Sequence, residues 1–262
     1  MTVYALLGAT GNLGSAILRC LLSSHWQIPD LRINILVRSK SKLLQAFPQL
    51  ESASSATITI FEGSISDENT LKACINGAST IYVCVSTNYA SRKVDIAVTT
   101  AAHLVAALGQ LRKDRESEYN TPVLLFNRSL ALNSDVQLPV PGFIKRFTVF
   151  AIWYIYEDLL KAGAVYAGAE KDGLLTYITA DGPVLMGPNR TEATGYKLME
   201  RGKSSAALNY ADFGIAMVEL GQRREEFGGK VVGISATGAV QTDILGNIWI
   251  IILGLKSRLI PF

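Results

Sequence analysis

The chain has 262 residues, of which 49% are hydrophobic and 18% charged, and its formal net charge is +3. This composition supports a large buried core and excludes a disordered chain. The small net charge and the lack of a lysine- or arginine-rich block argue against nucleic acid as a partner.

The first pair of elements is a strand over Tyr4–Leu7 and a helix over Leu13–Leu22, joined by the glycine-rich stretch GATGNLG. A glycine at each of three positions allows a sharp reversal, close approach of a pyrophosphate and tight packing of the helix on the strand. The helix N-terminus then offers N–H groups to phosphates. We therefore predict a dinucleotide-binding turn, the alternative being a strand-to-helix turn without a ligand. The expected cofactor contacts are Gly8, Thr10, Gly11, Asn12, Leu13 and Gly14.

The second strand, Ile33–Val37, is followed by the basic stretch RSKSK, and we find no acid near its end in the sequence. An acid there would bind the ribose 2′-hydroxyl of NAD and repel a 2′-phosphate, whereas a guanidinium binds that phosphate through two donors. We therefore predict NADP(H), held by Arg38 and Lys42. The alternative is an ordinary basic, solvated loop.

Short polar residues follow the third and fourth strands, which we place at Thr57–Phe61 and Thr80–Val85. We expect them to line the adenine and the nicotinamide half of the cofactor, although such residues are also common in turns. They are Ser64, Ser86, Thr87 and Asn88. Between these strands, Asp67 has the position of a helix start and Gly77 that of a C-terminal glycine.

Strand and helix patterns continue to alternate up to residue 180, which predicts an α/β fold of the Rossmann type, a doubly wound parallel sheet with helices on both faces. The later elements that we expect are strands at Val123–Phe126 and Leu175–Thr179 and helices at Asp67–Asn76, Arg92–Gly109 and Ile152–Ala169.

We divide the chain into a dinucleotide-binding core, 1–180, and a substrate-lid and C-terminal region, 181–262, which packs on the core as part of one structural unit. Asp181-Gly182-Pro183 has the composition of a turn, and a polar excursion follows it to Ser205. Long excursions after the later strands of this fold form the substrate lid, because ligands bind at the carboxyl ends of the strands. Beyond it we expect a helix at Tyr210–Leu220 and a strand at Lys230–Ile234.

The C-terminal run Ile244–Leu255 is strongly apolar and is followed by Lys256 and Arg258. At about twelve residues it is too short to span a membrane, which takes roughly twenty. We expect a docked helix or the interface of a homodimer. The alternative is peripheral membrane contact through residues 244–258.

Cysteine and histidine are rare, with 3 and 2 residues, and no CxxC spacing occurs. This argues against a zinc site or a disulfide framework, so we expect no metal. Free buried thiols suit a reducing compartment, and no secretory signal precedes the first strand. We therefore expect a cytoplasmic protein.

Together these motifs resemble the atypical short-chain dehydrogenase/reductase superfamily and, within it, the NmrA-like branch. The resemblance rests on GATGNLG, VRSKSK, FEGSISD and VCVSTN. More narrowly, IYEDLLKA and TADGPVLMG are similar to the averufin-oxidase-type oxidoreductases of fungal aromatic polyketide pathways. The resemblance implies an NADP(H)-dependent oxidoreductase of secondary metabolism, with an anthraquinone- or xanthone-type small molecule as substrate.

The superfamily's Tyr-x-x-x-Lys pair is missing from the helix where the resemblance would place it. The one literal match, Tyr89 to Lys93, follows the fourth strand, on what we take to be the wrong helix. By resemblance, Ser129 has the position of a substrate-polarising hydroxyl, and Tyr156 and Asp158 of the IYEDL segment are candidates for proton transfer. Alternatively, Ser129 is a turn hydroxyl and Asp158 forms a surface ion pair with Lys161.

A further departure is Ala180-Asp181, where relatives usually carry a basic residue and a proline before Gly182. Besides the oxidoreductase, two other functions stay open. One is an NADP-sensing binding protein like the NmrA-type regulators, which keep the glycine turn and lose the Tyr-Lys pair. The other is a redox-neutral isomerase or cyclase that uses the same pocket.

Overall fold

The computed structural model describes residues 2–23, 28–51, 57–115, 118–187, 191–241 and 244–259 of the chain. In 244–249 it describes the backbone only. The side chains in the first part of the apolar C-terminal run therefore lie outside the described residues.

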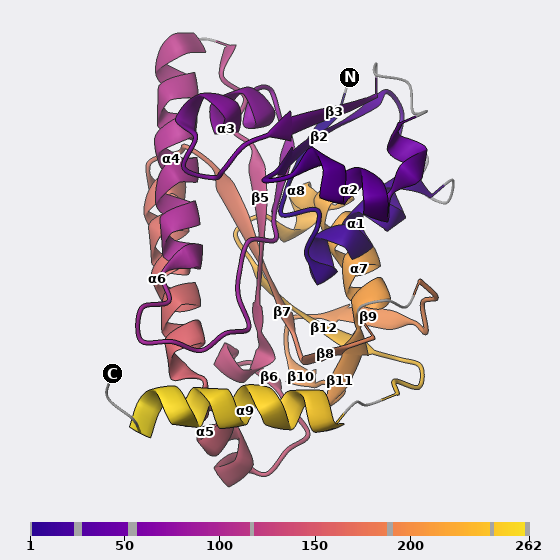
Figure 1. Ribbon diagram of the computed structural model, residues 1–262, viewed down its shortest axis with the longest axis vertical. Coiled ribbons are helices and arrows are strands. Elements are labelled where there is room, and N and C mark those ends of the chain that lie inside the picture. The colour runs from indigo at the N-terminus through magenta and orange to yellow at the C-terminus, as the bar shows by residue number, and fades with distance from the viewer. Residues whose placement is uncertain are drawn as a thin grey trace.

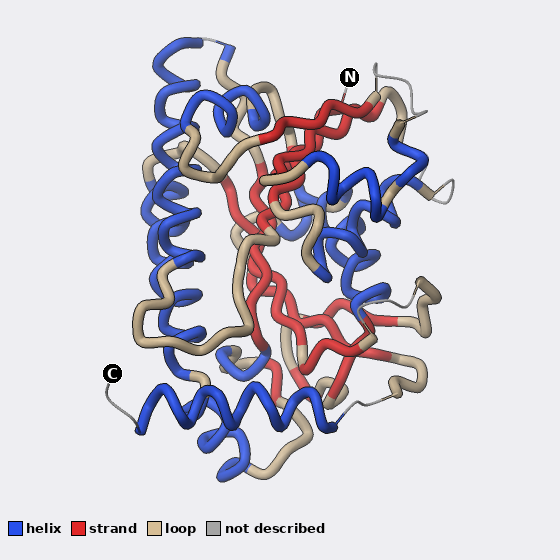
Figure 2. The backbone as a smooth tube through the Cα atoms, in the orientation of Figure 1, coloured by secondary structure: helices blue, strands red, loops and turns tan. Residues whose placement is uncertain are grey.

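A central sheet runs through the molecule in the order β3-β2-β1-β4-β5-β7-β12-β9 (Figures 1 and 2). All neighbours pair parallel except β12 and β9, which are antiparallel. Its strands are β1 (Thr2–Leu7), β2 (Leu31–Val37), β3 (Ile58–Glu62), β4 (Thr80–Val83), β5 (Val123–Ser129), β7 (Thr176–Gly182), β9 (Tyr196–Met199) and β12 (Val231–Ala236). The predicted Rossmann-type parallel sheet is confirmed.

Two small parallel pairs join β6 (Val136–Gln137) to β10 (Gly202–Lys203) and β8 (Val184–Met186) to β11 (Ala207–Asn209). Both pairs lie near the end of the molecule where β9 and β12 are found (Figure 1). The β6–β10 pair ties the segment after β7 to the segment after β5, whereas the β8–β11 pair joins two parts of the segment after β7.

Helices cover both faces of the sheet, as Figure 2 shows. One face carries α1 (Asn12–Leu22), α2 (Lys40–Ala46), α7 (Tyr210–Gln222) and α8 (Arg224–Phe227). The other carries α3 (Glu68–Ile75), α4 (Ile96–Arg115) and α6 (Trp153–Lys171). At one end, α5 (Gly142–Ala151) packs against α9 (Ile244–Leu259).

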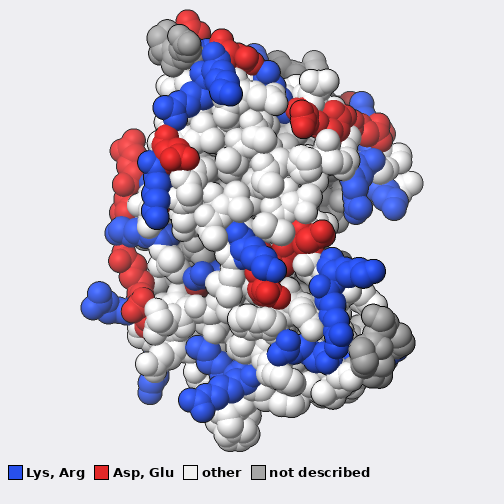
Figure 3. Space-filling view, turned by 90° about the vertical axis from the view of Figure 1, so that its left-hand side faces the viewer, with Lys and Arg blue, Asp and Glu red and all other residues white. Residues whose placement is uncertain are grey.

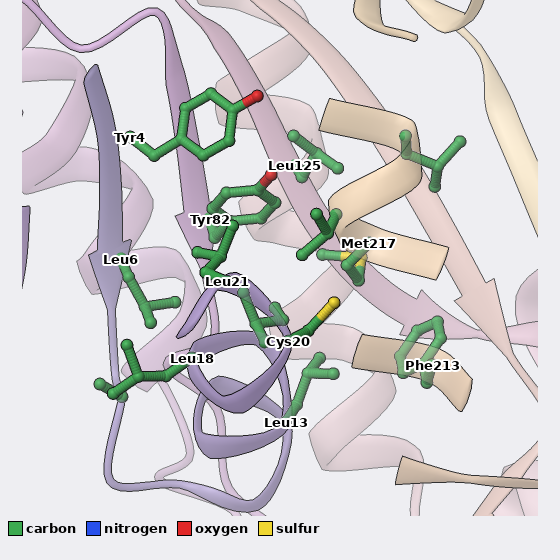
Figure 4. Packing of buried hydrophobic residues seen from close by; sticks show 14 of the residues in the cluster. Tyr4, Leu6, Leu13, Leu18, Cys20, Leu21, Tyr82, Leu125, Phe213 and Met217 are labelled. Atoms are coloured by element: carbon green, nitrogen blue, oxygen red, sulfur yellow. The ribbon is translucent and has the colours of Figure 1, made fainter. Parts of the chain in front are cut away.

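The core between the sheet and α1 and α7 is drawn in Figure 4. Tyr4 and Tyr82 of neighbouring strands are buried there, with their rings edge to face at a centroid distance of 5.6 Å. Such a pair contributes about 0.5–1.5 kcal/mol beyond the area it buries. Leu21 from α1 and Met217 from α7 close the same cluster, which fixes α1 on the sheet and thereby places its N-terminus.

The element predictions were wrong in several places. The strand predicted to reach residue 85 ends at Val83, and the next helix begins at Ile96 rather than residue 92, because a loop connects them. The helices α2 and α5 were not predicted. The predicted turn at 181–183 is wrong because β7 continues to Gly182, and our division at residue 180 therefore falls inside a strand.

A buried carboxylate on α7 holds the excursion after β8 in place. Asp212 of α7 is fully buried and accepts hydrogen bonds from the backbone N–H groups of Thr194 and Gly195, at 3.0 and 2.9 Å. The Thr194 hydroxyl donates to it as well, at 2.8 Å. These contacts hold the excursion on α7, which itself packs against α1 of the core.

Candidate active site

Four strand ends meet at one edge of the sheet and define the candidate site. Leu7 pairs with Val83, Val83 with Phe126, and Phe126 with Thr179, all in parallel register. The segments that follow these strands therefore lie side by side. In doubly wound folds this edge is where ligands bind.

The glycine turn after β1 has the backbone that the motif predicts. Gly8 has φ +89°, a conformation that favours glycine. A Cβ on Gly14 would lie 2.1 Å from the carbonyl oxygen of Gly8, so that only glycine fits between turn and helix. Gly11 precedes α1 without a side-chain cap, and the first turn carries no acid. The first N–H groups of α1 thus form a cradle that fits a diphosphate.

The other predicted residues of this turn divide into two groups. Thr10 and Asn12 are exposed at the rim of the cradle, where their side chains can reach a bound molecule. Leu13 is buried, and its side chain belongs to the core beneath the sheet. Any contact from Leu13 to a cofactor would therefore come from its backbone.

The end of β2 is basic and exposed, as expected, but an acid lies beside it. Arg38, Lys40 and Lys42 are not buried, and the last two lie in the first turn of α2. Glu62 ends the adjacent strand β3 opposite Val37, and its carboxylate accepts the backbone N–H of Lys40 at 2.9 Å. The sequence around Arg38 holds no acid, as stated above, but the fold brings one to this strand end from the neighbouring strand.

The polar residues predicted to follow β3 and β4 lie at those strand ends. Ser64 is at least partly exposed, and its Oγ accepts from the Ser66 hydroxyl at 3.1 Å. Ser86, Thr87 and Asn88 lie in the loop after β4, where the Thr87 hydroxyl accepts the Tyr89 N–H at 3.0 Å. Their contact with a cofactor stays a prediction.

Two of the predicted catalytic side chains lie together. Ser129 ends β5 and Tyr156 lies on α6, and Ser129 Oγ is 3.2 Å from Tyr156 Oη, within hydrogen-bond distance. The Tyr156 side chain is buried. Burial raises the pKa of this phenol, and the hydrogen bond with Ser129 partly offsets that rise. The phenol is therefore protonated at neutral pH and lies within hydrogen-bond distance of a serine hydroxyl.

Asp158, the third predicted catalytic residue, has a different environment. Both of its carboxylate oxygens accept backbone N–H groups at the start of α4, from Ala97 and Val98, each at 2.9 Å. It is buried and does not pair with Lys161, which pairs instead with Glu157 at 3.2 Å. The surface ion pair is therefore wrong. A carboxylate engaged at both oxygens caps a helix, so we withdraw Asp158 as an acid or base.

The literal Tyr-x-x-x-Lys match is not on a helix. Tyr89 and Lys93 lie in the loop between β4 and α4, and Tyr89 is 64% exposed. Arg92 of the same loop donates to the backbone oxygens of Ser257 and Arg258, at 3.1 and 3.2 Å. The loop that follows β4 is thus fastened to the end of α9, and the match has no link to Tyr156.

A buried polar cluster next to Ser129 was not predicted. Arg128 makes two hydrogen bonds to Asp181, both at 2.9 Å, and Asn133 donates to the same carboxylate at 2.8 Å. Burial raises the pKa of Asp181, and the hydrogen bonds and charge of Arg128 oppose this. In the sequence this cluster was indicated only by Asp181, where the chain departs from the pattern of the family that it resembles. Arg128 and Asp181 lie opposite each other on the neighbouring strands β5 and β7, so the ion pair links the ends of these two strands.

Comparisons with known proteins agree with this architecture. Residues 2–110 match the NmrA-like family. Averufin oxidase A of Aspergillus flavus is 39% identical over 92% of this chain and 85% of its own length. The chain belongs to the NmrA-like family. Averufin oxidase A of Dothistroma septosporum is 43% identical over 91% of this chain and 85% of its own.

Among solved structures, a short-chain dehydrogenase/reductase of Veillonella parvula in complex with NADP is similar in fold. Its TM-score is 0.66 at 18% sequence identity, over 90% of this chain and 95% of that one. The family, the fold and the oxidoreductase relatives together support an enzyme of the oxidoreductase class. They agree with the resemblance inferred from the motifs.

Proposed function

We propose that this NmrA-like protein is an NADP(H)-dependent oxidoreductase that acts on an aromatic polyketide of the anthraquinone or xanthone type. The observation that carries the proposal is the Ser129–Tyr156 pair, at 3.2 Å, at the same sheet edge as the glycine turn. A polar pair beside a nucleotide cradle is what carbonyl or quinone reduction requires.

The cofactor part of the proposal rests on how the glycine turn and the end of β2 fit the phosphates of NADP(H). The cradle between Gly8 and Gly14 excludes side chains and presents the N-terminus of α1 to a diphosphate. The exposed Arg38 at the end of β2 would bind a 2′-phosphate, and Lys42 would add charge. The solved NADP complex of the similar Veillonella parvula protein supports this cofactor. The negative charge of Glu62 weakens the expected preference for NADP over NAD. One carboxylate does not neutralise the three cations Arg38, Lys40 and Lys42.

A bound nicotinamide would exchange a hydride with the substrate. The protein's own contribution is the proton. Tyr156 Oη holds a proton at neutral pH because burial raises its pKa, and Ser129 Oγ keeps that hydroxyl directed. In the reductive direction Tyr156 would donate to the substrate oxygen while Ser129 donates a hydrogen bond to it.

The substrate class rests on the relatives named averufin oxidases, which match most of this chain. An averufin-like molecule is planar and aromatic, and a quinoid carbonyl of such a molecule can take up a hydride. The test is steady oxidation of NADPH by the purified protein with a panel of anthraquinones and xanthones. Turnover with at least one of them is expected, and none with aliphatic ketones.

Tyr156→Phe is expected to lower kcat by about 100- to 10,000-fold, the usual contribution of a general acid. Tyr154→Phe is the matched control, since Tyr154 lies on the same helix with its ring beneath the Arg258 guanidinium. It should keep wild-type kcat. Equal losses in both variants, or no loss in Tyr156→Phe, would contradict the assignment of the proton donor.

One observation favours a second function, an NADP-sensing regulatory protein. The residue four positions after Tyr156 is Leu160, 39% exposed, so no lysine lies where the superfamily uses one to activate the tyrosine. NADPH binding without turnover on any quinone, together with a copurifying protein partner, would support the sensor. Product formation without consumption of NADPH would instead support an isomerase or cyclase.

A further inference from the structure

The helix α5 carries apolar side chains that the fold leaves uncovered. Phe143 is 74% exposed, Phe147 50% and Phe150 45%. Their spacing of four and three residues places these rings on one side of the helix. Ile144 is exposed beside them. Exposed aromatic side chains clustered in this way on a short helix mark an interaction surface rather than a solvated one.

Cations border this surface. An open groove beside α5 is lined by Lys145, Arg146 and Arg258, with Val149, Phe150 and Trp153 as its apolar wall. The Arg258 guanidinium lies 4.6 Å from the centre of the Phe150 ring, which fixes its position on that wall. The groove therefore offers positive charge directly next to exposed aromatic rings.

No acid balances this charge nearby in the sequence. From Val136 to Tyr156 and from Ile244 to Phe262 the chain contains no Asp or Glu. The lower end of the face in Figure 3 accordingly shows Lys and Arg atoms among uncharged ones, apart from the residues that are not described. The end of the molecule formed by α5 and α9 is thus apolar and basic together.

We propose that α5 docks this protein onto an anionic lipid bilayer surface. Phe143 and Phe147 would enter the boundary between headgroups and acyl chains, while Lys145, Arg146 and Arg258 meet lipid phosphates or carboxylates. The contact is peripheral, because no helix in the described part of the chain is long and apolar enough to cross a membrane. A second copy of the chain fits less well, since two such faces would bring like charges together.

Close packing against α9 holds α5 in place for this role. Gly254 of α9 lets the two helices meet at backbone distance, because a Cβ there would lie 2.4 Å from the Ala151 carbonyl oxygen. Trp153 lies one helical turn before Tyr156 on α6. Docking would therefore place the candidate active site next to the bilayer, in which a planar apolar compound dissolves. The docking proposal itself does not rest on the proposed function.

The test is co-sedimentation of the purified protein with vesicles of phosphatidylcholine alone or mixed with phosphatidylserine. We expect binding to the mixed vesicles, weak binding to the neutral ones, and weakening by salt. Lys145→Gln/Arg146→Gln should weaken binding about 25-fold, at roughly fivefold for each cation near the surface. Phe143→Ser/Phe147→Ser should weaken it at least about tenfold.

The matched control is Lys113→Gln/Arg115→Gln, which removes two exposed cations from the far end of α4. It should bind like the wild type. Equal weakening by the control, or no preference for anionic vesicles, would overturn the proposal. So would light scattering that shows a dimer which Phe143→Ser/Phe147→Ser disperses. Because every altered side chain is at least partly exposed, the variants should keep the wild-type thermal midpoint, and this is measured alongside.

Discussion

Replacement of Asp158 by alanine separates a catalytic role for this residue from a structural one. The carboxylate lies on α6, yet it accepts the second and third N–H groups of α4, those of Ala97 and Val98. It therefore acts as the N-cap of a 20-residue helix to which it is not adjacent in sequence. Asp158→Ala would leave two buried donors without a partner and remove a negative charge from the positive end of the helix dipole.

The expected cost follows from those contacts. A hydrogen bond to a charged group contributes about 1.5–3 kcal/mol, and a lost N-cap costs about 0.5–2 kcal/mol. Because the contacts overlap, we expect Asp158→Ala to lower the free energy of unfolding by about 3–5 kcal/mol. Asp158→Asn keeps one acceptor oxygen in the same space, so it should lose about half as much.

The assay is urea unfolding at neutral pH without cofactor, with kcat measured on the folded fraction. Glu157→Ala is the matched control, because Glu157 is the neighbouring residue and forms only a surface ion pair with Lys161. Such a pair contributes under about 0.5 kcal/mol. An Asp158→Asn variant that unfolds at the wild-type urea concentration and yet turns over about 100-fold more slowly would refute the capping role, since that is the behaviour of a general acid or base.

Three further predictions concern the cofactor and the proton. Arg38→Asp should weaken NADPH binding by about 10- to 100-fold in calorimetry and leave NADH binding nearly unchanged, whereas Arg32→Asp, exposed at the opposite end of β2, should change neither. Gly14→Ala should abolish binding of both coenzymes, since an added Cβ would come within 2.1 Å of a backbone oxygen in the turn; Gly109→Ala, with open space around the new atom, should bind normally. Because burial raises the pKa of Tyr156, its proton-donating form persists as pH rises, so kcat for reduction should stay level from about pH 6 to pH 9; a fall centred near pH 7 would point to another donor.

The parts of this fold that the sequence predicts correctly are those in which neighbouring residues determine the structure. The glycine turn is such a case, because Gly8 has the positive φ of +89° that favours glycine and a Cβ on Gly14 would clash with the Gly8 carbonyl oxygen of the same turn. The start of α3 is another, since Asp67 caps it through the N–H of Thr70 at 3.2 Å. Gly77, which follows the same helix, has φ +71° as a C-terminal glycine does. For these elements, local sequence is sufficient.

The misses concern contacts between distant segments. Glu62 reaches the end of β2 because β3 pairs with β2, and nothing in the sequence around residue 38 indicates that an acid lies there. Asp158 is 61 residues from the amide that it caps, and its sequence neighbours suggest a surface ion pair instead. In both cases the charge was visible in the sequence, and only the packing of strands and helices identifies its partner.

The same distinction divides the candidate site into two halves. Its diphosphate cradle is built within one βα unit, between β1 and the start of α1. Its chemical half joins Ser129 to a tyrosine 27 residues away and rests beside Arg128, whose partner Asp181 is 53 residues away. A substitution of Ser129 or Tyr156 can therefore alter the proton chemistry without disturbing the glycine cradle. The chain thus combines a local glycine cradle with a buried tyrosine and a serine that come from distant segments and meet at the same edge of the sheet.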